Sequence, residues 1–379
     1  MKKLLFVIHT LEGGGAEKVL VNLVNNLPRE KYKITVAGVF DGGVNKRFLK
    51  DDIEHIFLFK KIFRGNVILL KYLPPERVYK KLVGERHFDI VISYLEGTTA
   101  RIVSGCRDRQ TKKICWIHRE LDEAFYKGCF KSKEEADCVY ASFDRIVCVA
   151  NGLINNFCSF NGLYEKTVCL YNVNETAEII KKSKESADEA FLSDNVIKIC
   201  FIGKIIRNKG VLRLLRAHEI LCEKNIPHRF ILIGKGPLER KLASMLKEKG
   251  IEKDFVFAGY QTNPYRLLSR CDIFALPSYF EGFSTATTEA LILGLPCVVT
   301  ECSGMSELLG ENNEYGIVAK SEDEFYSALE KMVTDKKFRE HYAQKAKIRG
   351  EKFSMKETLK AHEKLFDELT EATDETETY

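Results

Sequence analysis

The segment that most restricts the possible folds of this chain is FALPSYFEGFSTATTEALILGLPCVVT, residues 274–300. Residues 272–276 are short and apolar, which predicts a buried strand that ends at the following proline. Residues 286–293 have the composition of a helix, which either Ser284 or Thr285 can cap. A strand, a loop and a helix in this order are typical of an open α/β sheet, which binds ligands at the carboxyl ends of its strands.

Two glutamates lie in this segment, eight positions apart. Glu281 is on the predicted loop at the end of the strand, and Glu289 is about one turn into the predicted helix. Carboxylates only accept hydrogen bonds, so two of them placed in this way suit the hydroxyl groups of a sugar and of a ribose. The same pattern also fits a simpler interpretation, in which one charge marks the helix start and the other lies on a solvated helix face.

A second motif lies upstream, in residues 197–209, IKICFIGKIIRNK. Its first six residues predict a strand, and Gly203 allows a close approach of the backbone at the end of that strand. Lys204, Arg207 and Lys209 then bring positive charge to the same end. Lysine ammonium groups are suited to a diphosphate, although an exposed basic turn without function would have the same composition.

Together these motifs resemble the carboxyl-terminal domain of the retaining group 1 (family 4) glycosyltransferases of GT-B fold, of the bacterial polysaccharide-biosynthesis type. FIGKIIRNKG matches the family's glycine and basic pattern, FILIGKGPLERKL its glycine-rich turn after a strand, and EGFSTATTEALILGLPCVV its paired glutamates. The resemblance implies a hexosyltransferase that keeps the anomeric configuration. It also implies two Rossmann-like, doubly wound parallel-sheet domains facing a cleft.

The resemblance implies roles for individual residues. Glu281 would contact the donor sugar and Glu289 the nucleotide ribose, while Lys204 and Lys209 would contact the diphosphate. Lys204 replaces an arginine that is frequent in the family, so the charge is kept but the bidentate fork is lost. The resemblance also places Tyr260 beside the nucleotide base. The remaining donor-binding positions are in the turns that follow the two strands: Gly203, Gly282, Phe283 and Ser284.

The amino-terminal half begins with LLFVIHTLEGGGAEKVLVNLVNNL, which predicts a buried strand, a turn at Gly13, Gly14 and Gly15, and an amphipathic helix. Gly14 and Gly15 are candidate site backbone, and a tight structural turn is the competing interpretation. The G-x-G-x-x-G spacing of dinucleotide-binding oxidoreductases is absent, although Asp41 could imitate their ribose-binding acid. Further apolar runs, which predict the strands of a parallel sheet, occupy residues 34–40, 89–93, 114–117, 145–149 and 167–170.

His118 follows a short apolar run in ICWIHRE, at the strand end where ligands collect. A single histidine is usually structural, but WIH resembles an element of bacterial polysaccharide glycosyltransferases whose histidine reaches the donor sugar. The resemblance therefore implies that His118 is catalytic together with Glu281, Lys204 and Lys209. Arg119 and Glu120 would line the acceptor path.

The length of 379 residues and the hydrophobic content of 45% are those of a globular chain with two domains. We expect an amino-terminal acceptor-side domain over residues 1–172 and a linker over 173–195. A nucleotide-sugar-binding domain would follow over 196–352. Residues 353–379 would form a helix that returns to the first domain and a frayed acidic tail.

Twelve cysteines without paired C-x-x-C spacing or a preceding secretory signal indicate reduced thiols and a cytoplasmic location. No apolar run is long enough to span a bilayer. Residues 60–81, KKIFRGNVILLKYLPPERVYKK, combine seven cationic residues with one acidic residue and many apolar ones. This composition predicts peripheral contact with the inner face of the cell membrane, or else a solvated helix face. The net charge of only +5 and the lack of a known module argue against nucleic acid.

These observations predict a retaining transferase that moves a sugar from a UDP-sugar, or alternatively a GDP-sugar, to a glycan acceptor. The acceptor would be linked to a polyprenyl diphosphate in the synthesis of a surface polysaccharide such as a capsule or exopolysaccharide. No D-x-D motif occurs, so we expect neither a catalytic metal nor a cofactor. Three alternatives remain: a sugar-nucleotide epimerase or hydrolase on the same fold, a catalytically silent partner that binds a sugar nucleotide, and an oxidoreductase.

Overall fold

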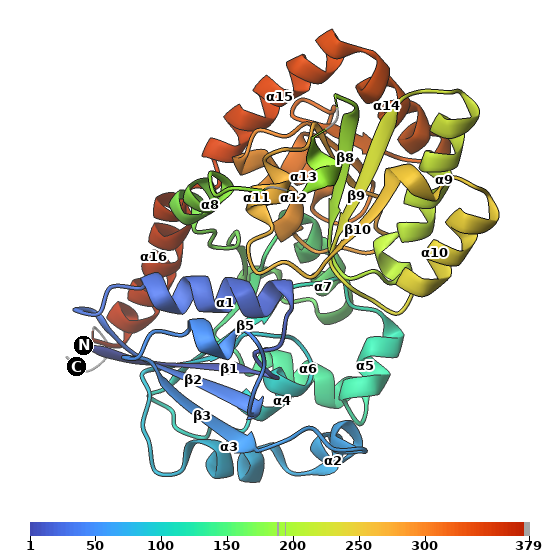
Figure 1. Cartoon of the computed structure of the whole chain (residues 1–379). Helices are drawn as coiled ribbons and strands as arrows, with labels where there is room; N and C mark the ends of the chain where they lie inside the picture. The colour runs from blue at the N-terminus through green and yellow to red at the C-terminus, as the bar shows by residue number, and fades with distance from the viewer. Residues whose placement is uncertain (188, 194, 375–379) are drawn as a thin grey trace. The chain divides into compact units, whose positions relative to one another are not determined.

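The structure is a computed structural model that describes residues 1–187, 189–193 and 195–374. The chain divides into two compact units (Figure 1). Unit 1 consists of Met1–Val173 together with the described part of Met355–Tyr379, and unit 2 consists of Asn174–Ser354. The chain therefore leaves unit 1 once and returns to it with its last helix.

Unit 1 is built on a parallel sheet with the order β3-β2-β1-β4-β5-β6-β7 within the described residues. Its strands are β1 (Lys2–Ile8), β2 (Tyr32–Phe40), β3 (Glu54–Phe59), β4 (Ile90–Ser93), β5 (Lys112–Ile117), β6 (Arg145–Cys148) and β7 (Thr167–Cys169). The central strand β1 pairs with β2 on one side and β4 on the other. It is a continuous apolar run from Leu4 to Ile8 because both of its faces are buried. The order of the strands reverses between β1 and β4, which is the switch point of a doubly wound sheet.

The helices of unit 1 connect these strands. They are α1 (Gly15–Asn26), η1 (Lys46–Phe48), α2 (Asn66–Tyr72), α3 (Pro75–Val83), α4 (Thr98–Val103), α5 (Glu123–Cys129), α6 (Lys133–Ala141), α7 (Asn151–Asn161), η2 (Tyr164–Lys166) and α16 (Met355–Asp374). The predicted first helix is confirmed. Its buried face includes Val19, Leu20 and Leu23, and the helix ends just before Pro28.

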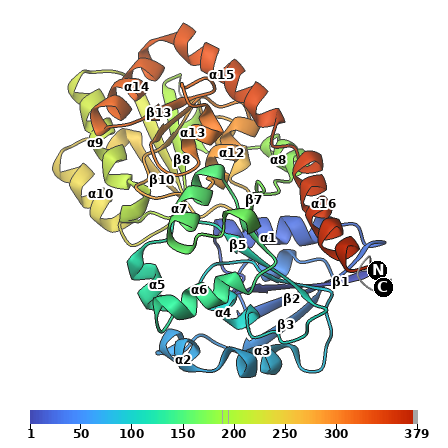
Figure 2. The same ribbon diagram turned by 180° about the vertical axis from the view of Figure 1, so that it is seen from behind.

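Helix α16 completes the core of unit 1 and lies beside β1 in both views (Figures 1 and 2). The ring of Phe366 contacts Phe6 and Tyr32 edge-on, with centroid distances of 6.4 and 5.9 Å. His362 stacks on Trp116 at 5.9 Å. The hydroxyl of Tyr32 also donates to Asp367 Oδ1 over 3.1 Å. The last helix of the chain is thus fixed to unit 1 by both apolar and polar contacts.

Unit 2 has a second parallel sheet, with the order β10-β9-β8-β11-β12-β13 within the described residues. Its strands are β8 (Ile197–Ile202), β9 (His228–Ile233), β10 (Phe255–Gly259), β11 (Ile273–Leu276), β12 (Cys297–Thr300) and β13 (Ile317–Ala319). Here the order reverses between β8 and β11, which pair directly. The two motifs singled out in the sequence therefore follow the two strands of the switch point.

The helices of unit 2 are α8 (Thr176–Ser183), η3 (Ala190–Leu192), η4 (Arg207–Lys209), α9 (Val211–Glu223), α10 (Glu239–Glu248), η5 (Glu252–Asp254), α11 (Tyr265–Leu268), α12 (Thr285–Ile292), α13 (Met305–Leu309), α14 (Glu322–Thr334) and α15 (Lys336–Glu351). Helix α12 packs closely against α15. A Cβ atom at Gly350 would lie 2.4 Å from the carbonyl oxygen of Leu291, so a larger residue would force the helices apart.

Two parallel α/β sheets confirm the predicted fold class. Residues 173–195, expected as a linker, contain α8, and Asn263 Nδ2 donates to the Lys182 carbonyl oxygen over 2.9 Å. The structure accordingly places α8 in unit 2. The end of the predicted acidic tail, residues 375–379, lies outside the described residues. Within the described part of the chain, no helix is both long enough and apolar enough to cross a bilayer.

Candidate functional site

The loops that follow β8 and β11 meet at the switch point of unit 2. Gly210 has a positive φ of 67°, and a Cβ atom there would lie 1.7 Å from the Pro277 carbonyl oxygen. Only glycine permits this approach. The backbone N–H of Tyr279 donates to the Asn208 carbonyl oxygen over 2.8 Å, and Arg213 Nη1 donates to the Pro277 carbonyl oxygen over 3.1 Å. The two loops are therefore held together by their backbones.

These loops bring together two of the predicted catalytic residues, which are 72 positions apart in the chain. Lys209 Nζ lies 2.5 Å from Glu281 Oε1, and the two side chains are 28% and 10% exposed. Ser278 Oγ donates to the same carboxylate oxygen over 2.7 Å. Glu281 is thereby fixed at the edge of the sheet, next to a cation that stays accessible from solvent.

Glu289 lies on α12 but does not face solvent. Glu289 is only 4% exposed, and its Oε1 accepts a hydrogen bond from the Tyr265 hydroxyl over 3.0 Å. The interpretation of Glu289 as part of a solvated helix face is therefore wrong. A carboxylate that is this well buried needs hydrogen-bond donors, and Tyr265 supplies one of them.

The amino terminus of α12 is directed at the same loops. Ser284 caps the helix, because its Oγ accepts a hydrogen bond from the Thr287 backbone N–H over 3.2 Å. Phe283 is buried, and its ring lies 5.6 Å from that of Phe353. The helix terminus concentrates N–H groups and a partial positive charge next to Gly282, an arrangement that favours anions.

Lys204 lies just after β8 and Tyr260 just after β10, with β9 between these two strands, and both side chains are exposed, Tyr260 to 54%. Gly203 follows β8 directly. These predicted donor-binding residues thus share one edge of the sheet with the Lys209–Glu281 pair, but among the described residues no side-chain hydrogen bond or ion pair joins Lys204 or Tyr260 to that pair. Their proposed roles remain predictions.

The remaining predicted residues belong to unit 1. Gly14 is the cap of α1 and Gly15 its first residue, in the loop that follows β1. Neither glycine has a positive φ. Asp41, which could have imitated a ribose-binding acid, forms an ion pair with Lys46 over 2.5 Å, and this lysine lowers the pKa of its carboxyl.

His118 follows β5, one strand away from the switch point of unit 1. Its backbone N–H donates to Glu96 Oε2 over 3.0 Å, and its ring lies 5.0 Å from that of Tyr94. Burial lowers the pKa of His118 to about 3, partly offset by a hydrogen bond with the Tyr94 backbone, so the imidazole is neutral at physiological pH. Within the described residues, neither His118 Nε2 nor the Tyr94 hydroxyl has a hydrogen-bond partner, although both atoms are buried.

Tyr94 and Glu96 were not predicted. Burial raises the pKa of both side chains. Both residues directly follow the apolar run 89–93, so the rule that pointed to His118, a polar residue at the end of a buried strand, would also have found them. The end of the unit 1 sheet therefore holds a cluster of three polar side chains next to the switch point.

Comparison with known proteins shows which families and structures this chain is similar to. Residues 182–349 match the family model described as "Glycosyl transferases group 1". A Campylobacter jejuni protein, the N-acetylgalactosamine-N,N'-diacetylbacillosaminyl-diphospho-undecaprenol 4-alpha-N-acetylgalactosaminyltransferase, is 26% identical over 93% of this chain and 96% of its own. The Escherichia coli UDP-Gal:alpha-D-GlcNAc-diphosphoundecaprenol alpha-1,3-galactosyltransferase is 24% identical over 85% of each chain.

Solved structures show the same fold. Anabaena Alr3699/HepE in complex with UDP and glucose superposes with a TM-score of 0.78 over 97% of this chain and 100% of its own, at 17% identity. TarM superposes with a TM-score of 0.76 over 97% and 99%, at 13% identity. At these identities the similarity concerns the fold, which is the GT-B fold of glycosyltransferases.

Proposed function

This chain carries a group 1 glycosyltransferase domain within a GT-B fold, and on that premise we propose that it is a retaining, metal-independent hexosyltransferase. Its donor is a nucleoside-diphosphate sugar and its acceptor a hydroxyl group of a lipid-linked glycan in polysaccharide synthesis. The observation that carries the proposal is the ion pair of Lys209 and Glu281 at the switch point of unit 2. It puts a cation for the diphosphate next to a carboxylate for sugar hydroxyls.

The reaction requires that a negative charge growing on the leaving diphosphate be stabilised. Lys209 and the more exposed Lys204 supply cations, and the amino terminus of α12 supplies backbone N–H groups. Glu281 accepts hydrogen bonds from the donor sugar, while Glu289 holds the ribose. The bond between the anomeric carbon and the phosphate oxygen breaks as the acceptor oxygen attacks from the same face. The acceptor's proton passes to the departing phosphate oxygen.

In unit 1, His118 is the proposed contact to the sugar. Its imidazole is neutral because burial lowers its pKa to about 3. A neutral ring can donate from one nitrogen and accept at the other, which suits a hydroxyl group. Gly14 and Gly15, in the loop at the end of β1, offer backbone to the donor phosphates.

The proposed substrates follow from the relatives. The Escherichia coli relative is described as using UDP-Gal, and Alr3699/HepE was crystallised with UDP and glucose. We therefore favour a UDP-sugar over a GDP-sugar. Both curated relatives act on glycans carried by diphospho-undecaprenol, so the proposed acceptor is a glycan linked to a polyprenyl diphosphate.

A lipid-linked acceptor requires contact with a membrane surface, and unit 1 has a surface that suits it. Helix α2 and the loop before it expose apolar side chains next to Lys60, Lys61 and Arg64, and we call these residues the α2 patch. Its apolar members are Ile62, Phe63, Val67, Ile68, Leu69 and Tyr72, each 38% to 65% exposed. Apolar groups beside cations favour an anionic bilayer, by about 1 kcal/mol per basic group near the surface.

Sedimentation with vesicles that contain an anionic lipid tests the α2 patch. Ile68→Glu should lower the bound fraction about fivefold, since it removes an apolar contact and adds repulsion. Ile348→Glu is the matched control, because Ile348 is 54% exposed on α15 of unit 2. Equal binding of both variants and the wild type would rule out the patch as the membrane contact.

The decisive test of the function combines binding and transfer. Calorimetric titration with UDP, GDP, ADP, CMP and NAD should show one nucleoside diphosphate that binds to the wild type and much more weakly to Lys209→Ala. The corresponding labelled sugar nucleotide should then be transferred to a polyprenyl-diphosphate glycan in the presence of EDTA, with NMR reporting an unchanged anomeric configuration.

The alternatives give different results in this test. Release of a free or epimerised sugar without acceptor would indicate a hydrolase or epimerase. Nucleotide binding without any transfer across a panel of acceptors would indicate a silent partner. Selective binding of NAD would contradict the proposal altogether, and loss of activity with EDTA would contradict its metal independence.

A further inference from the structure

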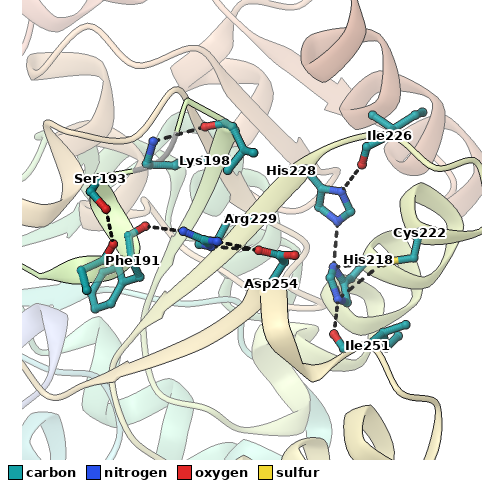
Figure 3. A network of polar contacts seen from close by, with 12 residues as sticks. Phe191, Ser193, Lys198, His218, Cys222, Ile226, His228, Arg229, Ile251 and Asp254 are labelled. Carbon is teal, nitrogen blue, oxygen red and sulfur yellow. Dashed lines mark hydrogen bonds and ion pairs between the residues drawn. The ribbon is translucent and has the colours of Figure 1, made fainter.

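A buried cluster of two histidines and a cysteine lies in unit 2, at the edge of the sheet opposite the Lys209–Glu281 pair. His218 and Cys222 are one turn apart on α9, and His228 is the first residue of β9 (Figure 3). His218 is fully buried and His228 is 4% exposed, while Cys222 is half-buried. One nitrogen of each ring and the sulfur all lie within 4.8 Å of one another. The function proposed above uses none of these residues.

The hydrogen bonds of the two rings leave a conflict between them. His218 Nε2 lies 2.8 Å from the Ile251 carbonyl oxygen, and His228 Nδ1 lies 2.7 Å from the Ile226 carbonyl oxygen. Carbonyl oxygens only accept, so both of these nitrogens must carry hydrogen. In two neutral rings the remaining nitrogens, His218 Nδ1 and His228 Nε2, are then both bare, and their lone pairs face each other over 2.7 Å.

An additional proton between the rings would resolve this conflict but would place a full charge in an apolar environment. The ring of His218 contacts Phe230 and Phe255, with centroid distances of 5.7 and 5.3 Å. A buried cation in such surroundings is disfavoured by desolvation. A metal ion resolves the same conflict differently, because both bare nitrogens become ligands and the thiolate of Cys222, at the half-buried side of the cluster, offsets part of the charge of the ion.

We propose that His218 Nδ1, His228 Nε2 and Cys222 Sγ bind a zinc-class transition-metal ion. Histidines that bind metals almost always donate their other N–H to a carbonyl or carboxylate, and Ile251 and Ile226 provide such acceptors. Imidazole and thiolate ligands favour zinc over the hard ions magnesium and calcium.

Metal binding requires the two rings to move apart and the cysteine side chain to turn. Zn–N bonds of about 2.0–2.1 Å in a tetrahedral site separate two nitrogens by roughly 3.3 Å, against 2.7 Å between the rings here. Cys222 Sγ is 3.9 Å from His218 Nδ1 and 3.7 Å from His218 Nε2, so its side chain must turn toward Nδ1 to reach the nitrogen–sulfur separation of such a site, roughly 3.5 Å. A water molecule would be the fourth ligand, reaching the ion from the half-buried side of Cys222.

The position of the site indicates a structural role. The three ligands join α9 to the start of β9, and the Ile251 carbonyl oxygen belongs to the segment that leads into η5 and β10. Ligands of doubly wound sheets collect at the carboxyl ends of strands, whereas His228 begins its strand. The metal would stabilise unit 2 without taking part in sugar transfer.

Cobalt titration of the full chain, first stripped with EDTA, tests the site through absorption. The wild type should bind one ion tightly and show a thiolate-to-cobalt charge-transfer band. Cys222→Ser should abolish this band. Zinc at about a hundred times its Kd should also raise the melting temperature of the wild type by roughly 5 °C.

Variants can remove one ligand nitrogen while keeping the neighbouring hydrogen bond. In His228→Asn the side-chain NH2 group takes the place of Nδ1 and can still donate to the Ile226 carbonyl oxygen. In His218→Gln the side-chain NH2 group takes the place of Nε2 and can still donate to the Ile251 carbonyl oxygen. Both should weaken cobalt binding at least tenfold and lose the thermal shift with zinc. Cys271→Ser, at a half-buried cysteine of the same unit, should behave as the wild type.

A wild type without the charge-transfer band, or with a band that persists in Cys222→Ser, would overturn the proposal. Zinc-independent melting would also overturn it and would favour the shared proton instead. Sugar transfer is measured separately, so failure of this site and failure of the proposed function are distinguishable.

Discussion

The two units have the same kind of sheet, but the strand ends at the switch point of unit 2 and those beside the switch point of unit 1 differ in charge. In unit 2 the loops after β8 and β11 bring together Lys209 and Glu281, an ion pair whose lysine is 28% exposed. In unit 1 the loops after β4 and β5 bring together Tyr94 and His118, which are kept neutral by burial. The same topology therefore supports two chemically distinct edges.

The difference matches the two parts of a sugar nucleotide. A diphosphate binds to cations and N–H groups. Its attraction to them is strongest where solvent and salt screen the charges only in part. A sugar presents hydroxyl groups, which neutral donors and acceptors can bind without a charge being buried. We infer that unit 2 supplies the charge stabilisation together with carboxylate acceptors for hydroxyl groups, and that unit 1 adds a neutral contact to the sugar through His118.

The largest effect should come from neutralising the carboxylate of unit 2. Glu281→Gln keeps the shape of the side chain but loses the charge that fixes Lys209 and accepts from the sugar. We expect kcat for sugar transfer to fall about 10³-fold, with an unchanged circular dichroism spectrum. Glu219→Gln is the matched control, because Glu219 is also ion-paired and is 13% exposed on α9. Near-normal turnover of Glu281→Gln would break the assignment of charge to this edge.

Removing the cation should affect nucleotide binding next. Lys209→Ala should raise the Kd for the preferred nucleoside diphosphate roughly 10- to 100-fold, since a charge-assisted hydrogen bond is lost. Lys204→Ala should have a smaller effect, because Lys204 is exposed. Isothermal titration checks both values. An unchanged Kd in Lys209→Ala would show that the diphosphate does not use the Lys209–Glu281 pair.

The neutral edge of unit 1 should respond in a different way. His118→Gln is expected to lower kcat/KM for the sugar nucleotide about tenfold, which corresponds to the free energy of one hydrogen bond. The Kd for the free nucleotide should stay the same. The Tyr94 hydroxyl, which is buried without a partner among the described residues, makes Tyr94→Phe a second probe of this edge. A loss of free-nucleotide binding in His118→Gln would contradict the division between the edges.

The smallest effect concerns acid stability. Because the folded-state pKa of His118, about 3, is below its unfolded value of 6.5, the unfolded chain binds the proton first as pH falls. This contribution to stability is therefore complete above about pH 6.5 and is lost on acidification. Between pH 7 and pH 5 the wild type should lose about 2 kcal/mol more than His118→Gln. Urea unfolding at the two pH values measures the difference, and parallel losses would refute it.

Much of this organisation could be predicted from short buried strands. Residues 197–202 were predicted as a strand and form β8, and Glu281 was expected at the mouth of the sheet, where it lies. Strand β3 was missed because it is an edge strand, in which Glu54 is exposed and the apolar residues are only partly buried, so its hydrophobic signal is weak.

Contacts between distant residues could not be predicted in the same way. Nothing in the local sequence places Lys209 next to Glu281, because that contact depends on the parallel pairing of β8 and β11 in the sheet. The burial of Glu289 likewise depends on Tyr265, which is 24 positions away. The cluster around His228 was missed for the same reason, since its ring partner belongs to a different element.

The discontinuity of unit 1 has a consequence for the order of synthesis. Ribosomes deliver residues 1–173 first, yet α16, which covers Phe6, Tyr32 and Trp116, is translated only after all of unit 2. These aromatic side chains therefore lack the cover of α16 while roughly half of the chain is still being synthesised. During that interval aggregation of the nascent unit 1 competes with its folding. Chaperones that bind exposed apolar surface would bind unit 1 most strongly at this stage.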